Sequence, residues 1–452
     1  MNYNESLLHY VWKHRLLPAS GLTTTDGQQV EIIDPGLYNR RNSGPDFFNA
    51  KVKIDGMLWV GNIEIHKKAS DWFAHGHQLD PAYDNTVLHV CAVVDAEAVT
   101  SSGKTLPQLQ IDVPADVLKG YEQLLREDRY PPCYLIIPEL SPLKLHSWMS
   151  ALQTERLEQK TEAIRRRAEL ANGSWEQAFF VTLARNFGFG INGDAFETWA
   201  QAVPLDACAH HRDNQFQIEA IFFGQAGMLS PDALPPRHRE AALADEYFQK
   251  LSAEYRYLAH KFSMKPMNFE LWRYLRLRPQ NFPGIRLSQL ASLYCSRRAG
   301  LRSLMECETI EQAQQMLVTQ VSDYWQTHYA FGAPSQKNTK RLSAASLDLV
   351  MVNTIVPMLF AYGRHTRKEE LCDRAFHFLE QLKPERNHVV SMWCKCGMTV
   401  ADAGDSQALI QLKSQYCDRK DCLRCRIGYE FIASNHKNPA VALLSEGGEL
   451  KG

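Results

Sequence analysis

The feature that most constrains the fold is a change in hydrophobic pattern near residue 115. Before it, short segments rich in valine and isoleucine are bounded by turn residues, a pattern typical of β-strands. After it, apolar residues recur at helical spacing over longer segments. The chain of 452 residues is also too long for one ordinary core. The sequence therefore predicts an α+β fold, with a mixed-sheet domain first and a large all-α region after it.

Residues 1–115 are predicted to form one helix followed by about five strands. Leu7 and Val11 share one stripe of the opening helix. Asp55-Gly56 lies between two of the expected strands and is a strong hairpin signal. The expected strands are Gln29–Asp34, Asn49–Ile54, Leu58–His66, Thr86–Val94 and Leu109–Val113.

Residues 116–390 are predicted to form a helical domain without the regular period of a solenoid. Residues 391–434 are expected to be a Cys-rich, metal-binding helical end, and 435–452 a flexible tail. The expected helices are Leu152–Leu170, Ser174–Phe187, Gln215–Phe223, Pro236–Ala259, Leu287–Tyr294, Ile310–Trp325, Ala344–Tyr362, Lys368–Leu382 and Ser406–Cys417.

Two acidic residues flank the predicted hairpin. Asp46 lies just before one strand, and Glu64 lies near the end of the next. Alternate residues of a strand share a face, so His66 lies on the same face as Glu64, and antiparallel pairing can bring Asp46 close to both. Two carboxylates with the carbonyl of Ile65 would form an oxygen-rich site suited to Mg²⁺ or Mn²⁺. Such a metal polarises a phosphodiester and acidifies a bound water.

This order of a helix, a strand, a PD-strand and an ExK-like strand resembles the PD-(D/E)XK nuclease superfamily, whose fold is restriction-endonuclease-like. The resemblance implies metal-dependent hydrolysis of DNA or RNA, with Asp46 and Glu64 as metal ligands and Glu5 as an additional acidic residue. The superfamily lysine corresponds to His66 in this chain. The catalytic base is therefore open. His66 could accept a proton near neutral pH, Lys67 points to the opposite face unless a bulge rotates it, and Lys51 or Lys53 on the neighbouring strand could substitute.

A histidine-rich segment follows the hairpin, from Ser70 to Val90. In the nuclease interpretation it forms a wall of the cleft beside Glu64 and contacts the substrate. Its imidazoles could instead bind zinc, as in a zinc hydrolase centred on His75 and His77. It could also be a loop whose side chains bond its own backbone. The candidate residues are His75, His77, Asp80 and His89.

The segments from Gly44 to Val90, with later ones such as NFGFGINGDAFE and RPQNFPGIRLSQLA, also resemble a bacterial family known only as a domain of unknown function. That similarity spans nearly the whole chain and implies no established activity.

The charge is balanced, with 50 basic and 51 acidic residues, which excludes a strongly basic protein that coats nucleic acid. Any contact with nucleic acid must then be local. The segment Arg273–Arg286 is predicted to be a rigid, non-helical connector, whose Arg278 and Arg286 could contact a phosphate backbone. The alternative is that these arginines cap helices or bridge domains.

Five of the 11 cysteines crowd near the end of the chain. This crowding favours metal ligation over disulfides, with zinc ahead of an iron–sulfur cluster. The alternative is reduced, buried thiols. The other six, Cys133 among them, are expected to be small buried hydrophobes. The predicted ligands are Cys394, Cys396, Cys417, Cys422 and Cys425.

No stretch approaches the roughly 20 apolar residues of a membrane helix, and the N-terminus lacks the apolar core of a signal peptide. We therefore expect a cytoplasmic protein without a membrane partner; the sequence does not indicate its oligomeric state. Two classes of function remain open besides the zinc hydrolase: a metal-dependent nuclease acting in repair or defence, and a non-catalytic interaction protein that keeps the same sheet as a scaffold.

Overall fold

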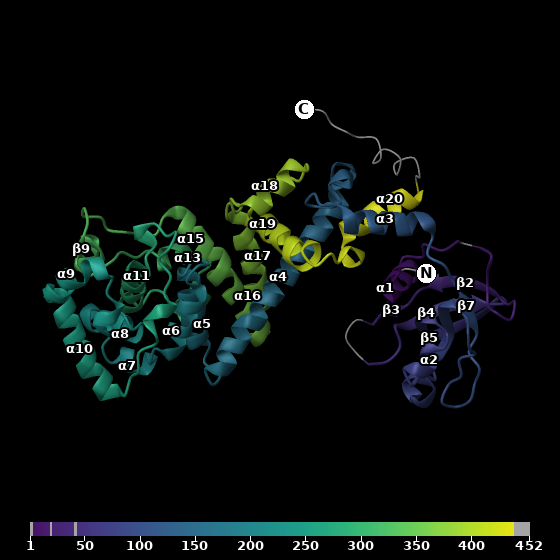
Figure 1. Cartoon of the computed structure of the whole chain (residues 1–452), viewed down its shortest axis with the longest axis horizontal. Helices are drawn as coiled ribbons and strands as arrows, with labels where there is room; N and C mark the ends of the chain where they lie inside the picture. Colours follow the sequence, from purple (N-terminus) through teal and green to yellow (C-terminus); the bar gives the residue numbers. More distant parts are fainter. Residues whose placement is uncertain (1–2, 19, 40–42, 438–452) are drawn as a thin grey trace. The chain divides into compact units, whose positions relative to one another are not determined.

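The computed structural model describes residues 3–18, 20–39 and 43–437, which form two compact units (Figure 1). The N-terminal unit consists of Met1–Ser141, Cys396–Met398 and Lys413–Gly452. The helical unit consists of Pro142–Lys395 and Thr399–Leu412. The strands of the large sheet are all in the first unit and most of the helices are in the second, so the architecture is α+β, as the change of pattern predicts.

The N-terminal unit is built on one mixed, seven-stranded sheet in the order β1-β2-β4-β5-β6-β7, with β3 paired to β4. The neighbours from β1 to β5 are antiparallel, whereas β5 pairs parallel with β6, and β6 with β7. A bridge between Thr24 and Leu109 connects the two ends of this order. The strands are β1 (Leu22–Thr23), β2 (Gln29–Asp34), β3 (Leu37–Tyr38), β4 (Phe47–Ile54), β5 (Met57–Lys68), β6 (Thr86–Val93) and β7 (Gln108–Gln110).

The hairpin predicted at Asp55-Gly56 is confirmed, because it connects β4 and β5. Helix α1 (Glu5–Lys13) packs on β5 through its buried Leu7, Leu8 and Val11. The predicted helical stripe is therefore the face that covers the sheet.

Segments from the far end of the chain complete this unit. Helix α20 (Arg426–Lys437) packs beside α3 (Ala115–Arg126) and the 3₁₀ helix η3 (Tyr134–Glu139), as Figure 1 shows for α20 and α3. The predicted tail begins at 435, yet its first three residues end α20, and 438–452 lie outside the described residues.

The helical unit has a core of large aromatic side chains, with Trp199, Phe222, Phe223 and Trp325 fully buried. Its longer helices are α4 (Pro142–Leu170), α5 (Trp175–Phe187), α6 (Gly193–Ala202), α8 (Gln215–Gln225), α10 (Glu246–Phe262), α11 (Pro283–Ser296), α16 (Val356–Thr366), α17 (Glu369–Gln381), α18 (His388–Lys395) and α19 (Ala403–Leu412). Its shorter ones are α7 (Leu205–Ala209), α9 (Arg239–Ala244), α12 (Leu301–Glu306), α13 (Ile310–Met316), α14 (Asp323–Gln326) and α15 (Ala344–Val350), beside a small hairpin of β8 (His328–Ala330) and β9 (Ala333–Pro334).

Two predicted helices are interrupted. The single helix expected at Pro236–Ala259 is wrong, because α9 ends before Asp245 and α10 begins after it. Asp245 is extended, and its side chain accepts the N–H of Phe248 at 3.0 Å, which caps the second helix. The helix expected at Ile310–Trp325 likewise stops at the end of α13 and resumes only as the short α14.

The apolar run from Ala344 to Thr366 corrects another expectation. By length and composition it could cross a membrane, with a mean hydropathy of 1.7, although no such stretch was expected. However, 61% of that window is buried in the structure, as in a core helix of a soluble protein. Its middle is a π-helical turn, Met351–Ile355, just before Pro357. Pro357 has no N–H to donate to the carbonyl of Asn353, four residues earlier. That carbonyl instead accepts from Asn186 Nδ2 at 2.8 Å. The run therefore has a structural explanation within the helical unit.

Candidate functional site

The two acidic residues of the hairpin meet in the structure. The backbone N–H of Asp46 donates to Glu64 Oε2 at 3.0 Å, and the N–H of Ile65 donates to Asp46 Oδ2 at 2.9 Å. Each carboxylate thus has one oxygen bonded to the backbone of the neighbouring strand. Glu64 is buried, and its other oxygen, Oε1, faces two histidines.

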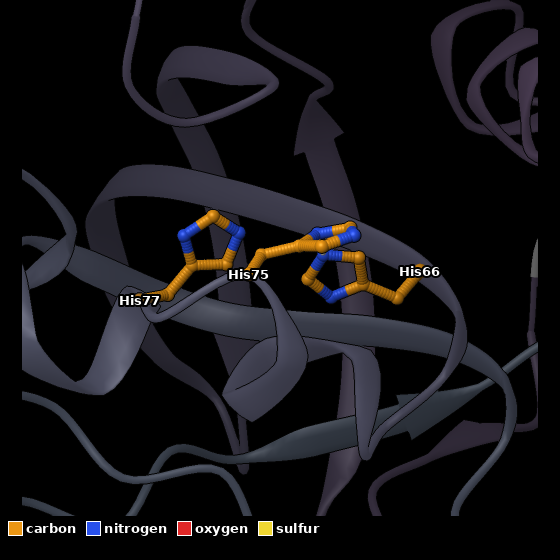
Figure 2. Close-up of side chains that lie close together, drawn as sticks. All are labelled: His66, His75 and His77. Atoms are coloured by element: carbon orange, nitrogen blue, oxygen red, sulfur yellow. The ribbon is translucent and has the colours of Figure 1, made fainter.

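The imidazoles of His66, His75 and His77 lie close together (Figure 2), and those of His66 and His77 face Glu64. One ring nitrogen from each of His66, His75 and His77 lies within 4.8 Å of the other two. Glu64 Oε1 is 3.3 Å from His77 Nε2 and 3.6 Å from His66 Nε2, and His66 Nε2 is 3.2 Å from His75 Nδ1. His66 and His77 are buried, whereas His75 is exposed. The group therefore has one side open to solvent.

Local structure explains why these rings converge. His66 follows Glu64 by two residues on β5 and shares its face. His75 ends the short helix α2 (Asp71–Ala74), and Gly76, at φ 76°, turns the chain so that His77 points back to the same place. A side chain at position 76 would be strained in that conformation.

Neighbouring aromatic and polar groups fix the orientation of the imidazoles. His66 Nδ1 lies 2.9 Å from Nε2 of His89 on β6, and His89 Nδ1 lies 3.3 Å from Gln108 Nε2 on β7. The ring of His77 stacks on Tyr83, with centroids 3.9 Å apart, and meets Trp72 edge to face. The parallel pairing of β5 with β6 sets Glu64 opposite His89 and so places this support.

Burial keeps the inner imidazoles neutral. Desolvation and then the neighbouring His89 lower the pKa of His66 to about 2, and desolvation and then His77 lower the pKa of His89 to about 4. Burial raises the pKa of Glu64, partly opposed by its contact with His77. His77 Nε2 is a buried nitrogen with no hydrogen-bond partner, although Glu64 is near. Neutral imidazoles have a lone pair for a cation, so the residues present fit a bound metal.

His9 is a site residue that was not predicted from the sequence. Its Nε2 lies 3.3 Å from Asp46 Oδ2, 3.5 Å from the carbonyl of Ile65 and 3.9 Å from Glu5 Oε1, while Nδ1 lies 3.3 Å from the hydroxyl of Tyr38. Burial lowers its pKa, but the bond to Asp46 and the charges of Asp46 and Glu5 outweigh burial and raise it overall. Glu5 and His9 are four residues apart on α1, a spacing that puts them on one helix face, so the signal was present in the sequence.

A pocket of about 280 Å³ adjoins His9 in the N-terminal unit. Helix α1 forms one wall through Asn4, Lys13 and other residues, and the segment 419–424 forms another. The basic residues that line this pocket, which we call the basic pocket, are Lys13, Arg419, Lys420 and Arg424.

The remaining candidates lie elsewhere. Lys67 is exposed, next to the buried His66 on β5. Asp80 caps a 3₁₀ turn, accepting the N–H of Ala82 at 2.9 Å. Arg278 is exposed in the helical unit.

Arg286 is not available as a surface phosphate contact. The predicted non-helical connector is wrong at its end, because Pro283 begins α11 and Arg286 lies in its first turn. The guanidinium is buried, donating to Gln289 at 2.8 Å and to Asn281 at 2.7 Å, and it covers the ring of Phe189.

The cysteines divide into two groups. Cys417, Cys422 and Cys425 lie in the N-terminal unit, close to Cys133, which was expected to be a scattered hydrophobe. Cys394 is exposed in the helical unit, and Cys396 is partly buried in the N-terminal unit. The thiols that raise the pKa values of Cys133, Cys417 and Cys422 are those of Cys417, Cys422 and Cys425.

Comparison with known proteins gives a family and no activity. A family model described as "Protein of unknown function (DUF2851)" matches residues 5–388. No curated protein and no solved structure matches the chain.

Proposed function

The chain belongs to the DUF2851 family of proteins of unknown function, and from the geometry of its N-terminal unit we propose that it is a metal-dependent hydrolase of phosphodiester bonds. One observation carries the proposal: three imidazoles lie together, and two of them, those of His66 and His77, face the buried carboxylate of Glu64. The ligands would be Glu64, His66, His75 and His77.

The donor set supports a transition metal. Three imidazole nitrogens and one carboxylate oxygen suit zinc, and several other transition metals, better than Mg²⁺, which takes oxygen ligands. We therefore propose zinc ahead of the Mg²⁺ or Mn²⁺ expected from Asp46 and Glu64 alone. The exposed side of His75 leaves a path for a metal, a water molecule and a substrate to enter.

The surroundings of the imidazoles resemble the support that metal ligands usually have. A ligating histidine commonly bonds a neighbour through its second ring nitrogen, which fixes its tautomer and orientation. His66 has this arrangement, with His89 at Nδ1 while Nε2 faces Glu64 and His75. Tyr83 and Trp72 hold the ring of His77 from two sides.

When bound, the metal would polarise a phosphoryl oxygen and acidify a coordinated water. The residues of the chain would hold and move protons around that centre. His9, next to Asp46, is the group whose surroundings favour the charged form, so it is suited to hold a proton at Nε2 and give it to the leaving oxygen. Asp46 would orient His9. The carboxylate of Asp46 is itself held in place by the bond that it accepts from the N–H of Ile65.

The basic pocket supports a phosphate-bearing polymer as the substrate. Its lining includes His9, whose Nε2 lies 3.3 Å from Asp46 Oδ2, so a chain bound along Lys13, Arg419 and Arg424 would lie next to the acidic pair of Asp46 and Glu64. Arginine and lysine contact phosphates without reading sequence. The balanced net charge fits a local contact of this kind. The resemblance of the hairpin to PD-(D/E)XK nucleases also favours DNA or RNA, with a function in repair or defence.

The test combines metal binding with cleavage, using the purified full-length chain. We expect binding of about one equivalent of zinc at the imidazoles and metal-dependent cleavage of DNA or RNA. Glu64→Gln and His75→Ala should each lower metal affinity and cleavage by about 100-fold or more. Lys68→Ala, an exposed change on the same strand, is the matched control and should leave both unchanged.

Two results would contradict the proposal. One is full metal binding by Glu64→Gln. The other is a wild-type chain that cleaves neither DNA nor RNA with Zn²⁺, Mn²⁺ or Mg²⁺. Loss of cleavage in Lys67→Ala would instead assign the base to that lysine.

A second candidate, the non-catalytic scaffold, is favoured by the reciprocal bonds between the hairpin strands. The carboxylates of Asp46 and Glu64 each accept a backbone N–H, and this alone stabilises the pairing of β4 with β5. The scaffold predicts no metal binding near Glu64. It also predicts that Glu64→Gln lowers the free energy of unfolding by about 1–3 kcal/mol through the weakened bond.

A further inference from the structure

Four cysteines that are far apart in the sequence lie together in the N-terminal unit. Three short packed elements and one helix carry them: η3, η9 (Lys413–Cys417), η10 (Cys422–Arg424) and α20. Helix α20 packs against η3 and η10, and η10 packs against η9. The cysteines are Cys133 just before η3, Cys417 at the end of η9, Cys422 at the start of η10 and Cys425 just before α20.

The thiols of this four-cysteine cluster influence one another electrostatically. Burial first, and then Cys425, Cys417 and Cys422, raise the pKa of Cys133. Burial and then Cys425 raise the pKa of both Cys417 and Cys422 to about 12, and Cys422 also raises the pKa of Cys417. Every pair among the four is therefore close enough to interact electrostatically.

We propose a metal centre bound by four thiolates, those of Cys133, Cys417, Cys422 and Cys425. Four cysteines, two of them in a CxxC segment, are the ligand set of structural zinc and of iron–sulfur clusters. The N-terminus of α20, directly after Cys425, stabilises negative charge on that thiolate.

The spacing of the sulfurs bears on which metal is bound. Among the described residues, three ligand atoms from His, Cys, Asp or Glu side chains lie within 4.8 Å of one another only at His66, His75 and His77. No three of the four sulfurs are that close, whereas thiolates on one zinc ion are about 3.8 Å apart. The wider spacing favours a cluster of several iron atoms.

The centre would connect the end of the chain to the sheet unit. It joins Cys133, which follows α3, to the segment 417–425. The residues between Cys417 and Cys422 include Arg419 and Lys420, which line the basic pocket. The proposed centre would thus fix one wall of that pocket, whether or not the imidazole group is catalytic.

The experiment measures zinc, iron and acid-labile sulfide in the full-length chain, purified without oxygen or chelator. We expect either about one zinc or about four iron atoms with sulfide per chain in addition to any metal at the imidazoles. Cys133→Ser and Cys422→Ser should lower this content at least about tenfold. Cys396→Ser, a partly buried cysteine outside the cluster, is the matched control. His75→Ala, measured in parallel, removes the imidazole-bound metal alone, so failure of one site is distinguishable from failure of the other.

A wild-type measurement keeps the test independent of folding defects in the variants. Substitution with Co²⁺ should give the sulfur-to-metal charge-transfer absorption of a thiolate site, which imidazole ligands do not produce. Absence of this band, together with no uptake of zinc or of iron and sulfide on reconstitution, would overturn the proposal. Full metal content in Cys133→Ser, with loss in Cys396→Ser, would also overturn it.

Discussion

The metal-free protein should lose stability as the pH falls from 6.5, because its buried imidazoles are neutral. His89 has an ordinary pKa of 6.5 in the unfolded chain and about 4 in the folded one, through burial first and then its neighbour His77. Between these values the unfolded chain binds a proton that the folded chain does not, so each pH unit lowers the free energy of unfolding by about 1.4 kcal/mol. From pH 6.5 to pH 5 the loss from His89 alone is about 2 kcal/mol.

Replacing His89 by Gln isolates this share. The substitution changes the free energy of unfolding at every pH. Because the variant has no imidazole at this position, its free energy of unfolding should fall by about 1.4 kcal/mol less per pH unit below 6.5 than that of the wild type. His66, with a folded pKa of about 2, contributes the same slope to both proteins in this window. The pKa of His9 is raised in the folded chain, so below pH 6.5 this histidine is protonated in both the folded and the unfolded chain. Its contribution to the free energy of unfolding therefore no longer changes with pH in this window. The pKa of Glu64 is also raised, so protonation of Glu64 adds to the free energy of unfolding as the pH falls, by the same amount in the wild type and in the variant.

The assay is native-state hydrogen exchange of amides in β5 and β6, read at pH 6.5, 6.0, 5.5 and 5.0 after metal removal. Exchange at these amides reports the opening of the N-terminal unit, separately from the helical unit. His260→Gln, an exposed histidine on α10, is the control and should leave the slope unchanged. Equal slopes for the wild type and His89→Gln would refute the reasoning that burial keeps this ring neutral.

Two further changes test the local structure that positions the site. Gly36→Ala places a Cβ 2.6 Å from the carbonyl oxygen of Phe48, at a residue with φ 90°, so it should lower the free energy of unfolding by about 2 kcal/mol or more in a denaturant titration. Gly27→Ala is the control, because Gly27 also has a positive φ but open space around it, and its effect should be smaller. Tyr83→Leu removes the ring stacked on His77 and should weaken zinc binding about tenfold in calorimetry; unchanged affinity would show that the stack does not orient this histidine.

The sequence was sufficient for the parts of the site that depend on local pattern. Alternation along β5 places Glu64 and His66 on one face, and Asp55-Gly56 connects the strands that bring Asp46 to Glu64. Both follow from a strand period of two and a two-residue turn. The four-residue spacing of Glu5 and His9 likewise places both side chains on one face of α1, so His9 could have been predicted from the same local pattern.

The rest depends on contacts between distant segments. The parallel pairing that sets His89 opposite Glu64 cannot be read from either strand alone, because register is a property of the whole sheet. Cys133 carries no local pattern that distinguishes a ligand from a buried hydrophobe. Arg286 was misplaced for a local reason, since Pro283 was taken as a helix breaker although proline is also favoured in the first turn.

The distribution of the N-terminal unit along the chain leads to a last prediction. Helix α1 supplies His9 and one wall of the basic pocket, whereas segment 419–424 supplies another wall and α20 covers α3. A chain truncated after Ser141 therefore lacks part of its own core, because Ile427, Phe431 and Ile432 of α20 are buried in the full chain. Burying three such side chains contributes about 5 kcal/mol or more, comparable with the whole stability of a small domain. We expect the truncated chain to be largely unfolded by circular dichroism, and to be rescued by adding residues 413–437 through a flexible linker. A stable, cooperatively folded fragment ending at Ser141 would show instead that the sheet and α1 form a domain independent of the C-terminal segment.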